Sequence, residues 1–277
     1  MKILVIGNKG MLGIAVYSYF KSKSYDVIGV SRNEFDIAKD DISKILPLIT
    51  QSDIVINCSG VIKPRIKDMS IEDVIKINSI FPRNLGKICK DLGRFSVHIT
   101  TDCVYSGITG PYDERSLFDS TDLYGMSKNA GEDPATMLVL RTSIIGEERG
   151  QSRSLLEWAK SQAGKTVNGY TNHLWNGITT LQFAKCIERI INNNIFKWHD
   201  LHHIFSPSDV TKDQLLQIMS DVYNLNLTIN KVTAPESCDR RLRTISAYCR
   251  ELDIPELSKQ LEELKIFFEG LDKYEKI

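Results

Sequence analysis

Residues 2–13 read KILVIGNKGMLG, an apolar run that ends in glycine and is followed by two more glycines. A short continuous apolar run is typical of a parallel strand covered on both faces. The glycine-rich segment separates it from an amphipathic stretch over residues 11–19. Strand, glycine-rich turn and helix in this order place helix amides against a pyrophosphate. The segment therefore predicts a dinucleotide site made by Gly7, Lys9, Gly10, Met11, Leu12 and Gly13.

Four more apolar runs follow, with helix-period segments such as residues 71–92 between them. The runs cover residues 26–31, 54–58, 96–101 and 137–143. Strands that alternate with helices predict a doubly wound parallel sheet with right-handed crossovers. We therefore expect an α/β fold, with a Rossmann-like parallel sheet and a smaller C-terminal substrate-binding domain.

The pattern loosens after residue 146. Residues 155–163 have helical spacing and residues 165–177 have the composition of a loop, whereas a helix near 181–191 and a strand near 201–205 restore the regular pattern. We interpret this as two interleaved domains. The expected NAD(P)-binding domain covers residues 1–146 and about 178–205, and the expected substrate domain covers about 147–177 and 206–277.

Composition excludes several classes of protein. The 277 residues include 35 Lys and Arg against 35 Asp and Glu, so the chain lacks the positive field of a nucleic-acid or anionic-lipid binder. No apolar run reaches the length of a membrane span, and the first is too short for a signal peptide. The six cysteines and the histidines at 199, 202 and 203 lack metal-site spacing. We expect a cytoplasmic protein with reduced thiols, no metal, no nucleic-acid partner and no membrane association.

Ser31 and Arg32 stand at the end of the second predicted strand. A site that prefers NAD usually has an acid there, which binds the ribose 2′-hydroxyl. A hydroxyl and a guanidinium suit a 2′-phosphate instead. We therefore expect NADPH to be preferred and NADH to be accepted more weakly; the alternative is that Arg32 is a solvated loop charge.

Tyr124 and Lys128 lie four residues apart in the stretch YGMSK, on one face of a predicted helix. An ammonium group so placed can lower the pKa of a phenol. Thr100, Thr101 and Asp102 end the fourth predicted strand, at the carboxyl edge of the sheet where such folds bind ligands. A hydroxyl, a phenol and a lysine are thus expected to converge there.

Five segments in this order resemble the extended short-chain dehydrogenases, and within them the dTDP-4-dehydrorhamnose reductases and related nucleotide-sugar 4-ketoreductases. They are GNKGMLG (7–13), TTDCVYSG (100–107), PYDE (111–114), DLYGMSKNAGE (122–132) and LRTSIIG (140–146).

The resemblance implies a catalytic set of Thr101, Tyr124 and Lys128. Tyr124 would protonate the carbonyl oxygen of the sugar, Thr101 would hydrogen-bond to it, and Lys128 would hold the nicotinamide ribose and tune the phenol. The turn after the third strand is similar to the family's cofactor-contacting turn and comprises Asn57, Cys58, Ser59 and Gly60. The implied reaction is NAD(P)H-dependent reduction of the 4-keto group of a nucleoside-diphosphate 4-keto-6-deoxyhexose, linked to dTDP or UDP and with a hydroxyl or acetamido group at carbon 2.

On the substrate side, Cys103 stands where the rhamnose reductases generally have tyrosine. Trp175 and Asn176 are expected either to line the sugar pocket or simply to pack. Arg240 and Arg241 are expected either to clamp a diphosphate, as an arginine does in similar enzymes, or to be solvated charges.

The amino-acid sequence leaves three further questions open. Cys103 also matches a cysteine of fused 3,5-epimerase/4-reductases, although a reductase that needs an epimerised substrate is the favoured interpretation. The fold is also used by a cofactor-binding regulatory subunit of a methionine adenosyltransferase. A homodimer is compatible with the sequence.

Overall fold

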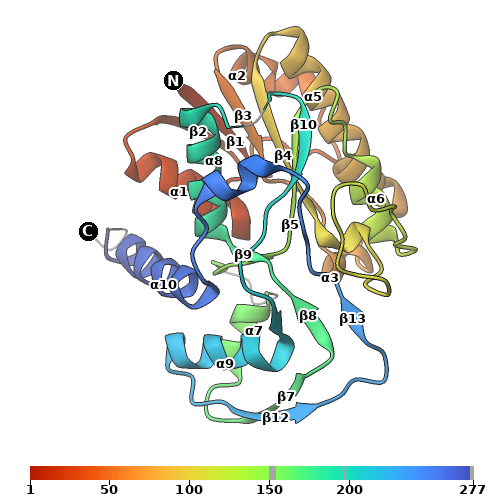
Figure 1. Cartoon of the computed structure of the whole chain (residues 1–277). Coiled ribbons are helices and arrows are strands. Elements are labelled where there is room, and N and C mark those ends of the chain that lie inside the picture. The colour runs from red at the N-terminus through yellow and green to blue at the C-terminus, as the bar shows by residue number, and fades with distance from the viewer. Residues whose placement is uncertain (150–153, 196, 275–277) are drawn as a thin grey trace.

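The computed structural model describes residues 1–149, 154–195 and 197–274 (Figure 1). Its strands are β1 Lys2–Ile6, β2 Asp26–Val30, β3 Ile54–Asn57, β4 Phe95–Thr101, β5 Leu138–Thr142, β6 Ile144–Ile145, β7 Thr166–Tyr170, β8 His173–Trp175, β9 Ile178–Thr179, β10 Asp200–His203, β11 Val210–Thr211, β12 Thr228–Val232 and β13 Cys238–Asp239.

Its α-helices are α1 Met11–Ser22, α2 Leu46–Thr50, α3 Lys63–Ile66, α4 Ile71–Ile75, α5 Phe81–Asp91, α6 Leu123–Ala130, α7 Leu155–Ser161, α8 Thr180–Asn193, α9 Lys212–Tyr223 and α10 Leu257–Tyr274. Short 3₁₀ turns are η1 Ile42–Ile45, η3 Asp102–Val104 and η4 Ala247–Leu252, and η2 Lys76–Ile80 is a π-helical turn. No helix of the described part of the chain is both long and apolar enough to cross a membrane.

The central sheet has six strands in the order β10-β5-β4-β3-β1-β2, and neighbouring strands pair in parallel. The predicted parallel sheet is therefore confirmed. The chain runs outward from β1 to β2 and then in the other direction from β3 to β10, so the order reverses between β1 and β3. Ligands of such sheets bind outside the carboxyl ends of the strands at this reversal.

Side chains of β1 alternate between two apolar layers. Ile3 and Val5 pack into the layer that contains α1 and α8, whereas Leu4 and Ile6 pack against α2 and α5. All four are at most 2% exposed. Burial on both faces explains why the strand is a continuous apolar run in the sequence.

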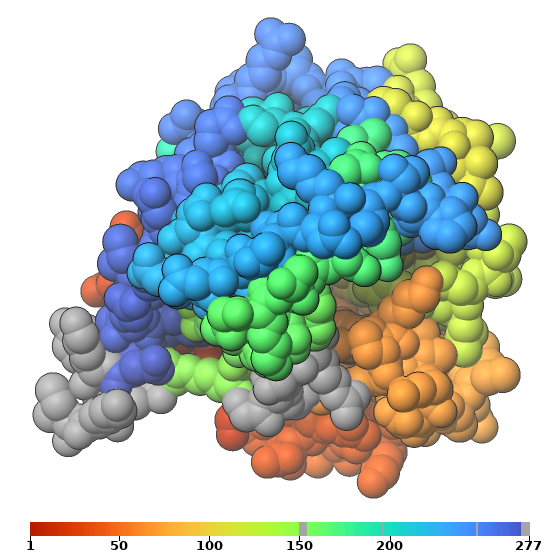
Figure 2. All heavy atoms as spheres, turned by 90° about the horizontal axis from the view of Figure 1, so that it is seen from below, coloured from red at the N-terminus to blue at the C-terminus, as the bar shows by residue number. Residues whose placement is uncertain are grey.

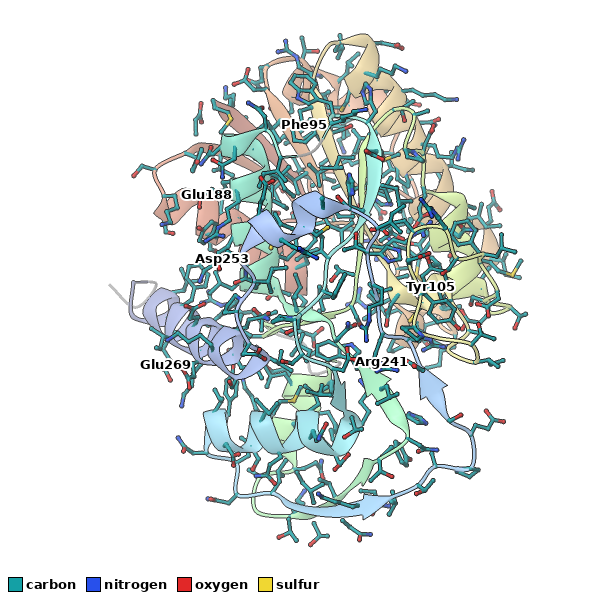
Figure 3. All side chains as sticks on the ribbon, in the orientation of Figure 1. Phe95, Tyr105, Glu188, Arg241, Asp253 and Glu269 are labelled. Carbon is teal, nitrogen blue, oxygen red and sulfur yellow. The ribbon has the colours of Figure 1, made fainter. Side chains whose placement is uncertain are left out.

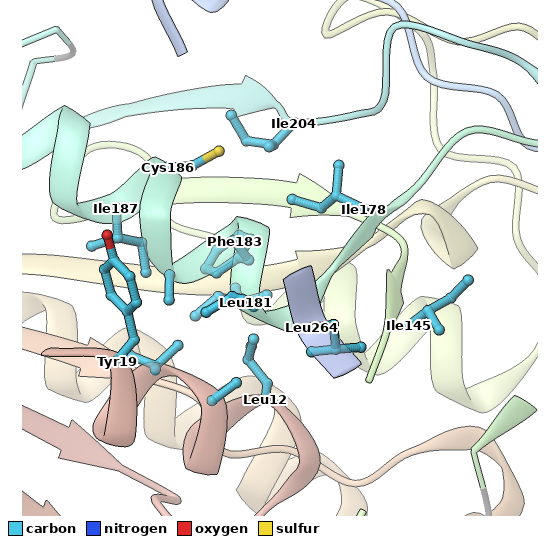
Figure 4. Packing of buried hydrophobic residues seen from close by; sticks show 14 of the residues in the cluster. Leu12, Tyr19, Ile145, Ile178, Leu181, Phe183, Cys186, Ile187, Ile204 and Leu264 are labelled. Carbon is cyan, nitrogen blue, oxygen red and sulfur yellow. The ribbon is translucent and has the colours of Figure 1, made fainter. Parts of the chain in front are cut away.

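The larger apolar cluster continues from the sheet into the C-terminal segments (Figure 4). Leu12 and Tyr19 of α1 meet Phe183 and Ile187 of α8, and Leu264 of α10 extends the cluster. Three leucines of α10 thus belong to the core: Leu257, Leu261 and Leu264 are at most 2% exposed.

Residues 154–175 and 207–240 form a small lobe below the carboxyl edge of the sheet in Figure 1. The expectation that residues 165–177 form a loop is wrong, because they contain β7, β8 and the start of the connection to β9. β7 pairs in parallel with β12, and β8 lies between β11 and β13. These partners come between about 35 and 65 residues later in the chain, and a segment as polar as TVNGY becomes a strand only when such a partner is present.

Candidate active site

The glycine-rich turn after β1 packs too closely for side chains at two of its three glycines. Gly7 has a φ of +83°, and a Cβ atom there would lie 3.0 Å from the Ser59 nitrogen. A Cβ on Gly13 would lie 2.0 Å from the Gly7 carbonyl oxygen. Gly10, by contrast, is the N-terminal cap of α1 without a side-chain cap bond, and its surroundings are open. The first amides of α1 are therefore available to a phosphate group.

The other residues predicted for this turn differ in their exposure. Lys9 is exposed and Met11 half-buried at the start of α1, whereas Leu12 is buried in the apolar cluster. Leu12 can therefore serve a cofactor only through its backbone.

The end of β2 presents polar atoms with nothing to bond to within the described part of the chain. These are the buried Oγ of Ser31 and the buried Oδ1 of Asn8. The amide of Asn8 lies against Gly29 of β2, where a Cβ would come within 2.2 Å of its nitrogen. Buried polar atoms normally have partners, so this corner fits the polar groups of an adenosine ribose.

Arg32 lies beside the same corner and is 61% exposed, with its Nε 3.3 Å from Asp36 Oδ2. Glu34 also lies here and accepts a hydrogen bond of 2.6 Å from the Ser31 amide. The Arg32 guanidinium would therefore have to bind Asp36 and a 2′-phosphate at the same time.

The turn after β3 is ordered by Asn57. Its Oδ1 accepts from the Ser59 amide at 3.1 Å, and its Nδ2 donates to His98 Nδ1 of β4 at 3.2 Å. Gly60 lies against α6, since a Cβ there would be 3.5 Å from Lys128 Nζ. Cys58 is enclosed beside them, and burial raises the pKa of its thiol.

The three residues of the expected catalytic set are brought together. Thr101 ends β4, and Tyr124 and Lys128 lie in α6, which Asp122 caps by accepting from the Gly125 amide at 2.8 Å. Gly125 lets α6 approach β4 closely, because a Cβ there would be 2.3 Å from the Cys103 carbonyl oxygen. Lys128 Nζ then donates to the carbonyl oxygen of Ile99 at 3.0 Å.

Burial sets the protonation of this group. It raises the pKa of Tyr124, and the neighbouring Thr101 hydroxyl opposes part of that rise. It lowers the pKa of Lys128 to about 8, while the Glu132 carboxylate acts in the opposite direction. Near neutral pH the phenol thus keeps its proton and the lysine is largely an ammonium, which is the arrangement required of a general acid and its cationic partner.

Asn78 is a buried residue beside the candidate site that the sequence did not indicate. It lies in the π-helical turn η2 and is 1% exposed. Its Oδ1 accepts from the Val61 amide at 2.8 Å, and its Nδ2 donates to Ser127 Oγ at 3.1 Å. It therefore joins the turn after β3 to α6 between Tyr124 and Lys128. In the sequence, the only sign of this turn is the polar pair Asn78 and Ser79 inside an apolar helical pattern. Single π turns often occur at functional sites.

The residues predicted to bind the substrate fall into two groups. Cys103 and Arg240 lie together next to Thr101: Arg240 donates to the carbonyl oxygens of Tyr105 (3.0 Å) and Ser106 (3.1 Å), with Nη1 3.9 Å from Cys103 Sγ. Burial raises the pKa of Cys103 to about 12, so its thiol stays protonated.

Asn176 and Arg241 instead have structural partners. Asn176 is buried, and its amide both donates to the Leu242 carbonyl oxygen and accepts from the Leu242 amide, each at 2.9 Å. Arg241 is bound by Asp239 and Asp209 at 2.7 Å each. Figure 3 shows it below Tyr105, in the segment that follows β13. Both side chains thus already have structural partners, and a role of either one toward a substrate stays a prediction. Trp175 is buried too, with Nε1 donating to Ser143 Oγ at 2.7 Å, so only its ring can meet a ligand.

A cavity of about 620 Å³ lies elsewhere, along the outer strand β10. Glu114, Asp200, His202 and Ile245 are among its lining residues, and none of the residues predicted for cofactor or substrate is.

Two groups of segments meet at the carboxyl edge of the sheet. In Figure 2 the green and light-blue atoms of the small lobe face the orange and yellow-green atoms that follow β3 and β4. The catalytic set and the glycine-rich turn therefore lie on the sheet side, and Arg240 and Trp175 come from the small-lobe side.

Comparison with known proteins agrees with this arrangement. Residues 1–216 match the model of the family described as RmlD substrate binding domain. Methionine adenosyltransferase 2 subunit beta of Xenopus laevis is 26% identical over 246 residues, covering 81% of this chain and 72% of that protein. Matches to the same subunit of Xenopus tropicalis and Danio rerio span only 41% and 42% of those proteins. A probable low-salt glycan biosynthesis reductase of Haloferax volcanii, Agl14, is 24% identical over 261 residues, covering 87% of this chain and 86% of that protein.

Among solved structures, a dTDP-4-dehydrorhamnose reductase of Bacillus anthracis in complex with NADP superposes with a TM-score of 0.79. It is 18% identical and covers 96% of this chain and 98% of its own, which shows a shared fold. The family match over most of the chain, together with the six-stranded parallel sheet, establishes that this chain belongs to the RmlD substrate binding domain family.

Proposed function

We propose that the protein is an NADPH-dependent reductase of a nucleoside-diphosphate-linked 4-keto-6-deoxyhexose. The observation that carries the proposal is the half-buried, protonated Tyr124, which lies beside the Thr101 hydroxyl and one helical turn from Lys128 at the carboxyl edge of the sheet. A relative named as a glycan biosynthesis reductase and a similar fold solved with NADP support it.

The residues present fit a nicotinamide dinucleotide. The open amides at the start of α1 would bind the pyrophosphate, and the unpartnered atoms of Asn8 and Ser31 would meet the adenosine ribose. Arg32 would pair with a 2′-phosphate, which favours NADPH. Lys128 has three donor protons and gives one to Ile99, so two remain for the nicotinamide ribose.

A reduced nicotinamide bound there would supply the hydride that the carbonyl carbon of the sugar accepts. Tyr124 gives its phenolic proton to the carbonyl oxygen, and the Thr101 hydroxyl hydrogen-bonds to the same oxygen. The ammonium of Lys128 stabilises the phenolate that remains, which lowers the cost of the proton transfer. Asn78 and Gly60 keep α6 and the turn after β3 in register for this step.

Cys103 favours a simple reductase over the bifunctional epimerase. Proton abstraction beside a ketone needs a thiolate, and burial together with Asp102 raises the pKa of Cys103 to about 12. The substrate is therefore expected to reach the protein with its final configuration at carbons 3 and 5.

The test supplies purified protein with NADPH and a dTDP- or UDP-linked 4-keto-6-deoxyhexose, with and without a separate 3,5-epimerase. We expect loss of nicotinamide absorbance only when the epimerised ketosugar is present. Cys103-dependent uptake of deuterium at carbon 3 or 5 from heavy water would instead support the bifunctional alternative.

A regulatory subunit is the second candidate, because the match to methionine adenosyltransferase 2 subunit beta covers 81% of the chain. On this alternative the protein would bind NADPH without turnover and alter the activity of a methionine adenosyltransferase added to it. Absence of turnover with every ketosugar, combined with such an effect, would replace the reductase proposal.

A further inference from the structure

His98 is a buried histidine of β4 whose ring makes a single hydrogen bond within the described part of the chain. The side chain belongs to a residue that is 2% exposed, and its Nδ1 lies 3.2 Å from Asn57 Nδ2. Asn57 is directly opposite His98 in the register of β3 and β4 and is also 2% exposed. Both groups are therefore shielded from water, and each depends on the other for its hydrogen bond.

The direction of this hydrogen bond follows from the other end of the Asn57 side chain. Oδ1 accepts from the Ser59 amide at 3.1 Å, and a backbone amide can only donate. Nδ2 is therefore the atom that faces His98, and it donates to Nδ1. An imidazole nitrogen accepts only when it carries no hydrogen, so the ring is neutral with its hydrogen on Nε2. Burial and the nearby Lys128 ammonium lower the pKa of His98, which keeps the ring in this state.

The turn after β3, which the Asn57 side chain orders, contacts two parts of the proposed cofactor site. On one side, a Cβ on Gly7 would be 3.0 Å from the Ser59 nitrogen, so this turn packs directly on the glycine-rich turn. On the other side, a Cβ on Gly60 would be 3.5 Å from Lys128 Nζ. A change in the shape of the turn would therefore disturb both regions.

We propose that His98 is a positioning residue for the cofactor: as a neutral acceptor it holds the Asn57 amide in the orientation that orders the turn after β3 for dinucleotide binding. This rests on the proposed function and adds a residue that acts through Asn57 rather than on the ligand. An apolar side chain would fill the same space at no cost in lost hydration, but it would leave the buried Nδ2 without an acceptor. The amide would then be free to turn and to release the Ser59 amide.

The first measurement is the state of the ring. ¹⁵N NMR of protein labelled at histidine distinguishes a protonated from an unprotonated ring nitrogen, and the signals that disappear in His98→Asn assign the residue. We expect His98 to have an unprotonated Nδ1 and a protonated Nε2 at neutral pH, with and without NADPH. A protonated Nδ1 would overturn the proposal.

Two substitutions separate the hydrogen bond from packing. His98→Leu is apolar and has no acceptor, and we expect it to weaken NADPH about tenfold, because only about a tenth of the molecules would hold the turn in its binding shape. His98→Asn can place a carbonyl oxygen where Nδ1 lies and should recover most of the affinity. Titration calorimetry of the folded variants measures both. In turnover, the loss should raise the KM for NADPH more than it lowers kcat.

Ser96→Ala is the matched control. Ser96 precedes His98 by two residues on the same face of β4, is 4% exposed, and has an Oγ without a partner in the described part of the chain. The substitution removes a buried polar atom from the strand but leaves Asn57 its acceptor, so NADPH affinity should stay the same. If His98→Leu fails to fold, His98→Val takes its place, and the ring state of the unchanged protein decides independently of both.

Three binding results would also overturn the proposal. These are unchanged NADPH affinity in the folded variant without an acceptor, equally weak binding in His98→Asn, and an equal loss of affinity in Ser96→Ala. Each would show that the imidazole acts by packing alone.

The reductase proposal fails separately. NADPH binding that depends on the acceptor at His98, without turnover of any ketosugar, would keep the role of His98 and remove the reaction. An unchanged protein that does not bind NADPH would overturn both.

Discussion

Lys128 Nζ donates a hydrogen bond of 3.0 Å to the carbonyl oxygen of Ile99, two residues before Thr101 in β4. This bond joins the helix that supplies the phenol and the ammonium to the strand that supplies the hydroxyl. The relative position of the three groups is therefore fixed by the protein before any ligand binds.

The pH dependence of the reaction should follow Lys128. Burial lowers its pKa to about 8, so the ammonium is present below that value and is lost as the pH rises through it. We expect kcat/KM to fall above about pH 8. Lys128→Arg keeps the positive charge at all accessible pH values, and any activity it retains should lack this decline. A profile of the unchanged protein that stays flat to pH 10 would exclude this role for Lys128.

Gly10→Ala and Gly13→Ala should have different effects. A Cβ on Gly13 would lie 2.0 Å from the Gly7 carbonyl oxygen, whereas its nearest neighbour on Gly10 would be at 3.4 Å. We expect Gly13→Ala to lower the free energy of unfolding. Gly10→Ala should leave stability close to normal and weaken NADPH, because the methyl group would occupy space that the pyrophosphate needs. Thermal unfolding and NADPH titration of both variants provide the check, and unchanged NADPH affinity in Gly10→Ala would contradict the assignment.

Glu132 and Arg141 form a buried ion pair next to the end of α6, with Glu132 four residues after Lys128. Arg141 donates from Nε and Nη2 to the two carboxylate oxygens at 2.9 and 2.5 Å, and both side chains are at most 4% exposed. Glu132→Gln should lower the free energy of unfolding by about 3–5 kcal/mol, because it leaves a buried guanidinium without its anion.

Denaturant unfolding measures this loss. Asp253→Asn, which breaks the exposed pair with Arg189, is the control and should have a much smaller effect. Equal effects of the two substitutions would show that the buried pair is not important for stability.

Cofactor preference should depend on Arg32. Since its side chain is 61% exposed and near Asp36, its contribution is expected to be modest, about a tenfold preference for NADPH over NADH. Arg32→Ala should weaken NADPH, leave NADH nearly unchanged and reduce the effect of salt on NADPH binding. Equal dissociation constants for the two cofactors in the unchanged protein would mean that Arg32 is only a surface charge.

The sheet and the meeting of Thr101, Tyr124 and Lys128 could be predicted because their signals are local. Short apolar runs mark β1, β3 and β5, and Tyr124 and Lys128 lie one helical turn apart. The carboxyl edge of a parallel sheet then brings Thr101 to them without further information.

The small lobe could not be predicted in the same way. β7 and β8 depend on partners far along the chain, and the roles of Asn176 and Arg241 depend on Leu242, Asp209 and Asp239 meeting them in space. Asn78 was missed because a π turn has no spacing rule of its own.

Tyr124→Phe tests the central claim most directly. The substitution removes the phenolic proton but keeps the ring, so NADPH affinity and stability should stay close to those of the unchanged protein. With NADPH and a saturating epimerised nucleotide 4-ketosugar, we expect kcat to fall by a factor of about 100 to 10,000, the usual contribution of one general acid. Near-normal turnover by this variant would contradict the assignment of Tyr124 as the proton donor.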